Sequence, residues 1–333
     1  MSAATSPPDR RPSARTVFLG SWASQIGITF AFLLLWGLFL VLAPRTFLSG
    51  AIYSSFAQTT PYFAIVAMML TLLIVAGDID LSFPSIMALG MVGFVWVWQQ
   101  TGSTELAVLA AIGVGALAGL LNGLIVTLIG LPALVVTIGT QFLYRGLTLV
   151  LVSGKTTALV GTRKSAIYDA LGGKPFGIPS EFYWLVLITI VSWVVLNRHR
   201  VGQNAYVIGD NRQAAQLMGI PIRSTRILLF VMVGVAAAFA GVLNSERVVN
   251  FYPGTIGTAF FLPALAAVFV GGTSVFGGRG SIYGTFIGAF MIGGIQAGIV
   301  AAGLTDYWTG LIYGAIILIS ISIHAVLQRR FER

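Results

Sequence analysis

The sequence predicts an all-α polytopic transmembrane bundle, and three observations lead to this fold class. First, 57% of the 333 residues are hydrophobic and only 9% are charged, whereas a soluble domain carries about 25% charged residues. Second, the apolar residues fall into runs of the length that crosses a bilayer as a helix, about 20 residues. Third, the connections between most runs are short, so little chain remains for a separate catalytic domain. We therefore expect about ten spans in a lipid bilayer.

The apolar runs set the expected order of the helices. The sixth run is short, and the breaks at 78–82 and 129–132 are tight, so eight or nine spans are the alternative to ten. The expected helices are 20–43, 57–77, 82–99, 104–128, 131–152, 183–197, 227–245, 257–274, 281–302 and 307–325.

The distribution of lysine and arginine predicts the orientation of these spans. If the N-terminus lies inside, the inner segments carry twelve basic residues and the outer segments carry six. Because basic residues are enriched in cytoplasmic loops, both termini are expected in the cytoplasm. The chain is then divided into a cytoplasmic tail 1–18, a single transmembrane domain 19–326 and a cytoplasmic tail 327–333. Within that domain, loop 153–182 is expected outside and loop 198–226 inside.

The composition excludes several functional classes. There is no cysteine, and both histidines, His199 and His324, fall at expected helix ends, so we expect no metal site and no catalytic residue. The segment Gly154-Lys155-Thr156 resembles the end of a phosphate-binding loop, but residue 149 is leucine where that loop needs glycine. No cofactor is therefore expected in this chain. The formal charge of +9 follows from the membrane topology, and no nucleic acid partner is expected.

Two carboxylates, Asp78 and Asp80, lie between apolar runs with almost no loop around them. A carboxylate near hydrocarbon is costly and usually functional. The alternatives are that both lie in the cytoplasmic headgroup region, or that they form a proton-coupled pair. Arg145 lies about 21 Å from the inner end of its own expected span, at a rise of 1.5 Å per residue. We expect it to face the protein interior or an aqueous path, or to extend toward the interface.

Small residues at intervals of four predict close helix packing. Such spacing lets the backbones of neighbouring membrane helices approach one another. The residues concerned are Gly115, Gly119 and Gly123 on one expected helix and Gly284 and Gly288 on another.

The inner loop contains a short helix-forming segment, Arg212–Met218. Asp210 or Asn211 can cap its beginning, and Gly219 can end it. A short capped helix of this kind can dock in the groove of a partner protein. The alternative is an ordinary solvated loop.

Together these features resemble one family, the permease subunits of ribose, xylose and arabinose-type bacterial ABC importers, a branched-chain-type, binding-protein-dependent permease family. The resemblance runs from about residue 20 to 325. Asp78 replaces a glycine that is usual in the first of the four stretches that carry the resemblance. These stretches are Ala76–Ser82 (Gly-Ile-Asp-Leu-Ser), Asn122–Gly146 (Asn-Gly, Pro and Thr-Leu-Gly…Arg-Gly), Gly209–Ile220 (Gly-x-Asn-x-x-Ala-Ala-x-x-x-Gly-Ile) and Ala266–Gly280 (Ala-Ala-Val-x-x-Gly-Gly-Thr-Ser-x-x-Gly-Gly-x-Gly).

The resemblance implies a transport subunit, not an enzyme, that spans the bacterial inner membrane several times. It implies import of a monosaccharide or sugar-like solute (pentose, hexose or polyol) by alternating access. The implied partners are a second permease copy, as a homodimer or a heterodimer with a paralogue, and a periplasmic sugar-binding protein. A cytoplasmic ATPase with two fused nucleotide-binding domains would hold the ATP and Mg.

The resemblance also assigns roles to residues. Coupling to the ATPase falls to Asn211, Arg212, Ala214, Ala215, Gly219 and Ile220, with Ala214 and Ala215 expected to face the ATPase groove. Residues expected in the translocation path or in structural polar contacts are Asp78, Asp80, Arg145, Asn122, Glu246, Phe260 and Phe261. Because the resemblance covers Asp80 but not Asp78, we expect Asp80 to be the harder one to replace and Asp78→Gly to be tolerated.

One departure from the family bears on the solute. Phe260-Phe261-Leu262-Pro263 stand where ribose-type members often have Tyr-Glu-Leu-Asp. This favours another sugar, a polyol or a cyclic sugar-like signal over ribose. The alternative function is an ion-coupled secondary transporter of a small neutral solute, in which Asp78 and Asp80 carry the coupling ion. A membrane-embedded enzyme would need a cluster of polar residues within the spans that the sequence does not contain.

Overall fold

The helices of the computed structural model follow the order predicted from the apolar runs. The structure describes residues 14–303 and 306–331. Each predicted span coincides with a helix: α1 (Ala14–Leu42), α3 (Gly50–Val75), α4 (Phe83–Thr101), α5 (Thr104–Leu124), α6 (Ala133–Leu151), α8 (Ser180–Arg198), α11 (Ile222–Val248), α12 (Phe261–Val270), α13 (Ile282–Ala301) and α14 (Asp306–Phe331).

An all-α polytopic membrane protein is confirmed by the length and composition of these helices. Among the described residues, seven helices are long and apolar enough to cross a membrane, namely α1, α3, α5, α6, α8, α11 and α13. The number of spans and the side on which the termini lie stay predictions. Both expected tails are shorter than predicted, because α1 already begins at Ala14 and α14 continues to Phe331; the rest of the two tails lies outside the described residues.

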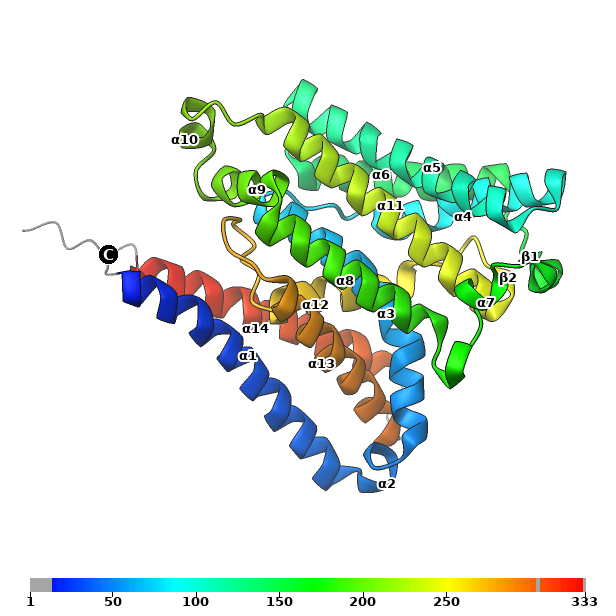
Figure 1. The fold of residues 1–333 in the computed structure, drawn as a ribbon, viewed down its shortest axis with the longest axis horizontal. Helices are drawn as coiled ribbons and strands as arrows, with labels where there is room; N and C mark the ends of the chain where they lie inside the picture. Colours follow the sequence, from blue (N-terminus) through cyan, green and yellow to red (C-terminus); the bar gives the residue numbers. More distant parts are fainter. Residues whose placement is uncertain (1–13, 304–305, 332–333) are drawn as a thin grey trace, which may run out of the picture.

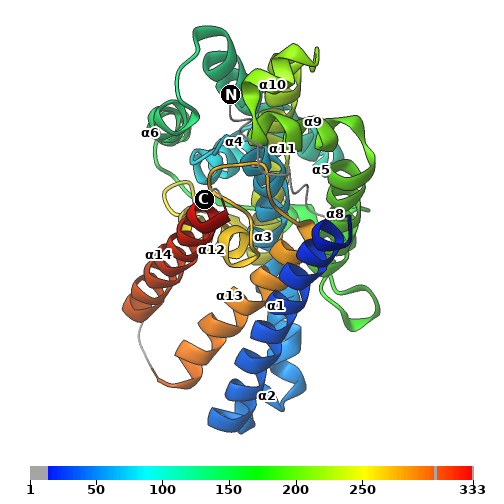
Figure 2. The same ribbon diagram turned by 90° about the vertical axis from the view of Figure 1, so that its left-hand side faces the viewer.

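The bundle is arranged around α3 and α11. From Thr60 to Val75 every residue of α3 is buried, which makes this helix the centre of the fold. In Figure 1, α4, α5, α6 and α11 lie on one side of α3, and α1, α12, α13 and α14 lie on the other. Figure 2 shows α1, α13 and α14 extending away from the body that the remaining helices form.

Two regions expected as loops contain more structure than predicted. The outer segment 153–182 holds a short strand that pairs antiparallel with a second strand after α11, Thr157 opposite Phe251 and Ala158 opposite Asn250. The inner segment 198–226 is mostly helical. The short elements are α2 (Pro44–Phe47), the π-helical turn η1 (Ile125–Ile129), β1 (Thr157–Ala158), the 3-10 helices η2 (Val160–Lys164), η3 (Pro175–Gly177) and η4 (Thr258–Phe260), α7 (Tyr168–Leu171), α9 (Arg200–Asp210), α10 (Arg212–Leu217) and β2 (Asn250–Phe251).

The spaced glycines lie where helices approach most closely. A methyl group added at Gly119 of α5 would lie 2.3 Å from the carbonyl oxygen of Phe230 on α11. Gly115 and Gly123 face α11 in the same way, and Gly284 and Gly288 of α13 face the backbone of α12. Any side chain at these five positions would push two helices apart, as expected for small-residue packing in a membrane.

The two ends of the bundle differ. Figure 1 shows α9 and α10 on the same side as the beginning of α1 and the end of α14, whereas β1, β2 and α7 lie on the opposite side. We call these the α10 end and the β1 end. The α10 end contains two non-helical breaks, break 1 (residues 76–82, between α3 and α4) and break 2 (residues 271–281, between α12 and α13).

Candidate functional site

Break 1 holds a buried carboxylate, Asp80, that is fully hydrogen-bonded. Its Oδ1 accepts from the Ser82 backbone N–H at 2.7 Å and from the Ser82 hydroxyl at 2.6 Å. Its Oδ2 accepts from Asn122 Nδ2 of α5 at 3.1 Å, and the same nitrogen donates to Ser82 Oγ at 2.8 Å. Asp80, Ser82 and Asn122 are almost completely buried. Since buried carboxylates are stable only with such partners, this network fixes the path of break 1 against α5.

Tyr144 of α6 extends this network and was missed by the sequence analysis. Its hydroxyl lies 3.0 Å from Asn122 Oδ1 and 3.0 Å from the carbonyl oxygen of Ala118, both as acceptors. The side chain is 3% exposed. The signal was a tyrosine within an apolar run, next to the more conspicuous Arg145. Three helices and a break therefore meet at one polar cluster.

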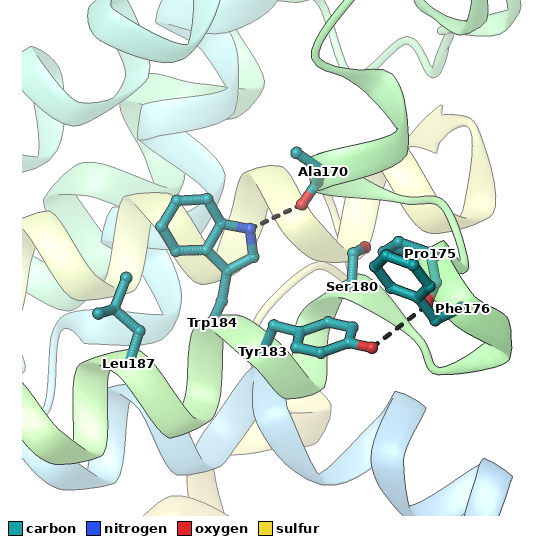
Figure 3. A pocket seen from close by; sticks show the side chains of 7 residues that line it. All are labelled: Ala170, Pro175, Phe176, Ser180, Tyr183, Trp184 and Leu187. Atoms are coloured by element: carbon teal, nitrogen blue, oxygen red, sulfur yellow. Dashed lines mark hydrogen bonds between the residues drawn. The ribbon is translucent and has the colours of Figure 1, made fainter.

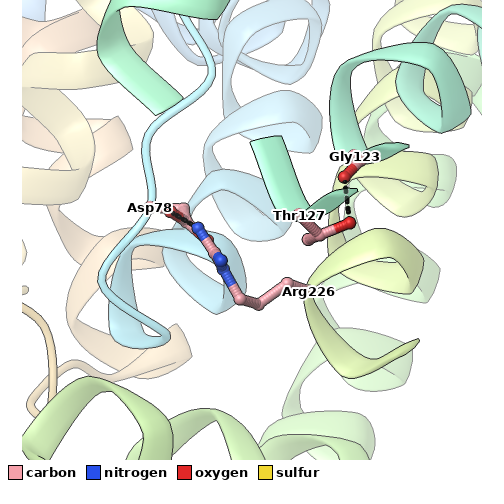
Figure 4. A network of polar contacts seen from close by, with 4 residues as sticks. All are labelled: Asp78, Gly123, Thr127 and Arg226. Atoms are coloured by element: carbon pink, nitrogen blue, oxygen red, sulfur yellow. Dashed lines mark hydrogen bonds and ion pairs between the residues drawn. The ribbon is translucent and has the colours of Figure 1, made fainter. Parts of the chain in front are cut away.

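Asp78, the other carboxylate of break 1, forms a buried ion pair with Arg226 of α11 (Figure 4). Arg226 Nη2 donates to Oδ1 at 2.6 Å, and Nε donates to Oδ2. Each side chain is 6% exposed. The sequence analysis placed Arg226 in a cytoplasmic loop, but it lies in the second turn of α11. The pair is bidentate, the strongest geometry for arginine and a carboxylate.

The C-terminal part of α9 packs against both breaks at once. A methyl group at Gly209 would lie 1.8 Å from the carbonyl oxygen of Val75 and 2.5 Å from the backbone nitrogen of Gly278. The Gly278 N–H donates to the same Val75 oxygen at 2.9 Å. The Tyr206 hydroxyl donates to the Gly280 carbonyl at 2.7 Å, and burial raises the pKa of Tyr206, which keeps this donor protonated.

Helix α10 forms one residue shorter than predicted and is capped as expected. Asn211, not Asp210, is the N-cap, and its side-chain oxygen accepts from the Ala214 N–H at 3.0 Å. Gly219 ends the segment with φ of +72°, a conformation that suits glycine.

The predicted orientation of α10 is wrong at Ala215. This side chain is fully buried within the chain, and Ala214 is half-buried. The reason is that Ala215 faces the rest of the protein, so the small residue serves packing inside the chain. The outward apolar side chains are Leu217 and Met218, 90% and 62% exposed. Asn211, Arg212 and Gly219 are exposed and Ile220 is half-buried.

Arg145 binds backbone at the β1 end. Its Nη1 donates to the Pro253 carbonyl at 2.7 Å, and its Nη2 donates to the carbonyls of Ile256 at 2.9 Å and Pro84 at 3.3 Å. It therefore faces the protein interior, one of the predicted alternatives. The segment after β2, which α12 follows, is held in place by this side chain.

Aromatic pairs continue from this segment into the bundle. Phe260 lies beside Tyr62 of α3, with ring centroids 5.6 Å apart, and Phe261 stacks on Phe83 of α4 at 5.9 Å. Both phenylalanines are half-buried. They replace the polar residues usual in the resembling family with apolar contacts.

Two buried glutamates lie at the β1 end. Glu246 of α11 accepts a hydrogen bond from Thr162 at 2.7 Å through Oε2. Glu181 of α8 accepts from the Tyr62 hydroxyl at 3.1 Å and lies 3.7 Å from Arg247 Nε. Neither glutamate is exposed. Glu181 was not identified from the sequence, although a glutamate that opens an apolar run was a visible signal.

An open cavity of about 340 Å³ lies beside this region (Figure 3). Its walls are almost entirely apolar, and Phe176 at its rim is 97% exposed. The lining residues are Ala170, Pro175, Phe176, Ser180, Tyr183, Trp184 and Leu187.

The residues grouped from the sequence are not brought together in one site. Asp78, Asp80 and Asn122 lie at the α10 end, close to the coupling residues, whereas Arg145, Glu246, Phe260 and Phe261 lie toward the β1 end. In the described part of the chain, no group of three or more histidine and carboxylate side chains could hold a metal ion. The polar clusters instead join helices to breaks and loops.

Apolar helices of membrane-spanning length, joined by buried polar clusters and ending in an exposed capped helix, define an integral multi-pass membrane protein. A family model described as "Branched-chain amino acid transport system / permease component" matches residues 52–321, and the chain belongs to this family. The resemblance to ABC permease subunits found in the sequence is thereby confirmed.

Individual relatives agree with the family. The chain is 31% identical to the ribose import permease protein RbsC of Escherichia coli over 311 residues, which cover 93% of this chain and 96% of the relative. It is 32% identical to the autoinducer 2 import system permease protein LsrD of Yersinia pseudotuberculosis, over 81% of this chain and 84% of the relative. LsrD of Photorhabdus laumondii is 32% identical over 78% and 80%. No solved structure matches the chain.

Proposed function

We propose that this chain is the membrane-spanning subunit of an ATP-driven importer that moves a monosaccharide or sugar-like solute across the bacterial inner membrane. Relatives that align over most of the chain are named for the import of ribose and of autoinducer 2. The observation that carries the proposal is α10, a capped helix that exposes Leu217 and Met218 beside the polar cluster of break 1. The α10 end is then cytoplasmic, as the basic residues predict.

The proposed partners follow from the same end of the molecule. A cytoplasmic ATPase with two fused nucleotide-binding domains, which supplies the ATP and Mg, docks on α10. A second permease copy, identical or paralogous, completes the path, and a periplasmic binding protein delivers the solute at the β1 end. The solute crosses by alternating access, without covalent chemistry in this chain.

An ion-coupled secondary transporter is less well supported by the geometry. Such a transporter needs a carboxylate that binds and releases its ion. Here both oxygens of Asp78 are bonded to Arg226, and both oxygens of Asp80 accept hydrogen bonds. These contacts favour structural roles for the two carboxylates.

The docking of the ATPase is tested by placing a charge on the exposed face of α10. Leu217→Asp removes an apolar side chain whose burial stabilises a contact by about 1.5–3 kcal/mol, so affinity for the ATPase is expected to fall about tenfold or more. Phe176→Asp is the matched control, since it changes an equally exposed apolar residue at the opposite end. Retention of the ATPase on the purified permease is the measurement. Equal retention by both variants would contradict docking on α10.

A further inference from the structure

The segment around α10 is fastened to the bundle at three places. Tyr206 binds the Gly280 carbonyl of break 2. Gly209 lies against the backbones of Val75 and Gly278, so the end of α9 touches the last residue of α3 and break 2 together. Arg226, just after the α10–α11 turn, is paired with Asp78 of break 1.

The connections between these fastenings leave little slack. Asn211 alone separates α9 from α10, and only residues 218–221 separate α10 from α11. A displacement of α10 therefore cannot be absorbed in flexible linkers on either side. It must either bend a helix end or move the backbone to which α9 and α11 are attached.

The ion pair is the fastening on the α11 side. Charge-assisted bidentate hydrogen bonds are strong and directional, and separating a buried pair leaves uncompensated charge. Arg226 and Asp78 are therefore expected to move together. Asp78 lies two residues before Asp80, whose bonds reach Asn122 on α5 and, through Asn122, Tyr144 on α6. A shift of Arg226 is thus passed to α4, α5 and α6.

Resting on the proposed function, we propose that Asp78 and Arg226 are positioning residues that transmit movement of α10 to break 1, while Gly209 and Tyr206 transmit the same movement to break 2. Both breaks would then rearrange in one step when the ATPase moves α10. Asp78 stands where the resembling family usually has glycine, so this fastening is a feature of this chain and not of the family pattern.

The test uses one introduced cysteine, because the chain has none of its own. Leu81→Cys places a thiol at a half-buried position of break 1. The permease is purified with its ATPase, and the rate of maleimide labelling of this thiol is measured without nucleotide and with ATP plus vanadate. In an otherwise unchanged chain the rate is expected to differ by about fivefold or more between the two conditions, in the usual range for coupling between sites.

The key variant is Asp78→Ala combined with Arg226→Met, which removes the pair without leaving one charge buried alone. The expected result is retention of the ATPase at the unchanged level with loss of the nucleotide-dependent difference in labelling. The matched controls are Asp210→Asn and Arg223→Gln, which remove exposed charges of the same types from α9 and α11; both should keep the difference.

Each other outcome decides against the inference. If the double variant keeps the full nucleotide response, the pair does not transmit movement. If it loses folded protein or ATPase in the same proportion as the response, the pair serves stability alone. If the unchanged chain retains no ATPase and shows no nucleotide response, the proposed function itself fails, which separates that failure from the failure of the inference.

Discussion

Break 1 and break 2 hold the chain by different chemistry. In break 1 the contacts are made by side chains, since Asp78 binds Arg226 and Asp80 binds Ser82 and Asn122. In break 2 they are made by backbone groups: the Ser274 N–H donates to the Arg279 carbonyl at 2.9 Å, and the Gly278 N–H donates to Val75. Break 2 has one charged side chain, Arg279, and it is exposed.

This difference shows two ways to stop and restart a helix inside a membrane protein. Backbone groups freed by a break must be satisfied within the protein. Glycines do this by letting backbones touch, and the cost of any change is steric. Carboxylates do it through a few specific bonds, and the cost of a change is electrostatic. The two breaks therefore differ in which substitutions they tolerate.

The largest effect is expected where both breaks meet α9. Gly209→Ala places a methyl group 1.8 Å from the Val75 carbonyl oxygen and against the Gly278 backbone, so the loss should exceed the about 1–3 kcal/mol of ordinary overpacking. We expect little monodisperse permease on size-exclusion chromatography. Gly139→Ala, on α6 with open space around it, should change the yield hardly at all, and similar yields for both would contradict the close junction.

Asp78→Gly tests the electrostatic fastening of break 1. The sequence alone predicts that this change is tolerated, because glycine is usual there in the resembling family. The structure predicts the opposite, since the variant leaves Arg226 buried without its partner, at a cost of about 3–5 kcal/mol. Thermal unfolding of the purified permease measures this loss. Asp78→Gly with Arg226→Met should recover most of it, and an additive loss in the double variant would mean that the pair contributes nothing.

Asp80→Asn should have an intermediate effect. The amide nitrogen would face Ser82 or Asn122 donors and leave one of them unpaired, which costs about 1–3 kcal/mol. We expect lower thermal stability and a larger loss of uptake than for Asp210→Asn, an exposed acid on α9. Stability equal to that of the unchanged chain would indicate that the Asp80 network is dispensable.

The smallest effect is expected in break 2. Thr273 is buried, and its hydroxyl makes no hydrogen bond among the described residues. Thr273→Val keeps the shape of the side chain and removes an unpaired polar group, so stability should stay equal or rise by up to about 1 kcal/mol. A loss as large as that of Asp80→Asn would show that break 2 also depends on side-chain bonds.

The sequence predicted the helices well, because a run of apolar residues is a local property that a bilayer makes decisive. It missed the first turns of α3, which begins at Gly50 where residue 57 was predicted, since Tyr53, Ser54 and Ser55 interrupt the run. It also missed α9, whose polar residues do not resemble a span, although Gly209 and Tyr206 make central contacts there.

The site was predicted in part. Asp78, Asp80, Asn122 and the cap of α10 were found because polar groups in apolar surroundings are conspicuous. Their partners were not, because the pairing of Asp78 with Arg226 joins residues 148 positions apart, and nothing local reports such a contact. The direction in which Ala215 points also depends on the packing of α10 against its neighbours, which a six-residue helix does not reveal.

The most direct test of the account is solute uptake into proteoliposomes that contain the permease, with and without its ATPase and binding protein. Labelled ribose and autoinducer 2, the solutes named in its relatives, are suitable probes beside a panel of pentoses, hexoses and polyols. The account predicts uptake of at least one sugar-like solute that requires both the ATPase and ATP inside reach of α10. Uptake by the permease alone, driven by a proton or sodium gradient and indifferent to ATP, would contradict it.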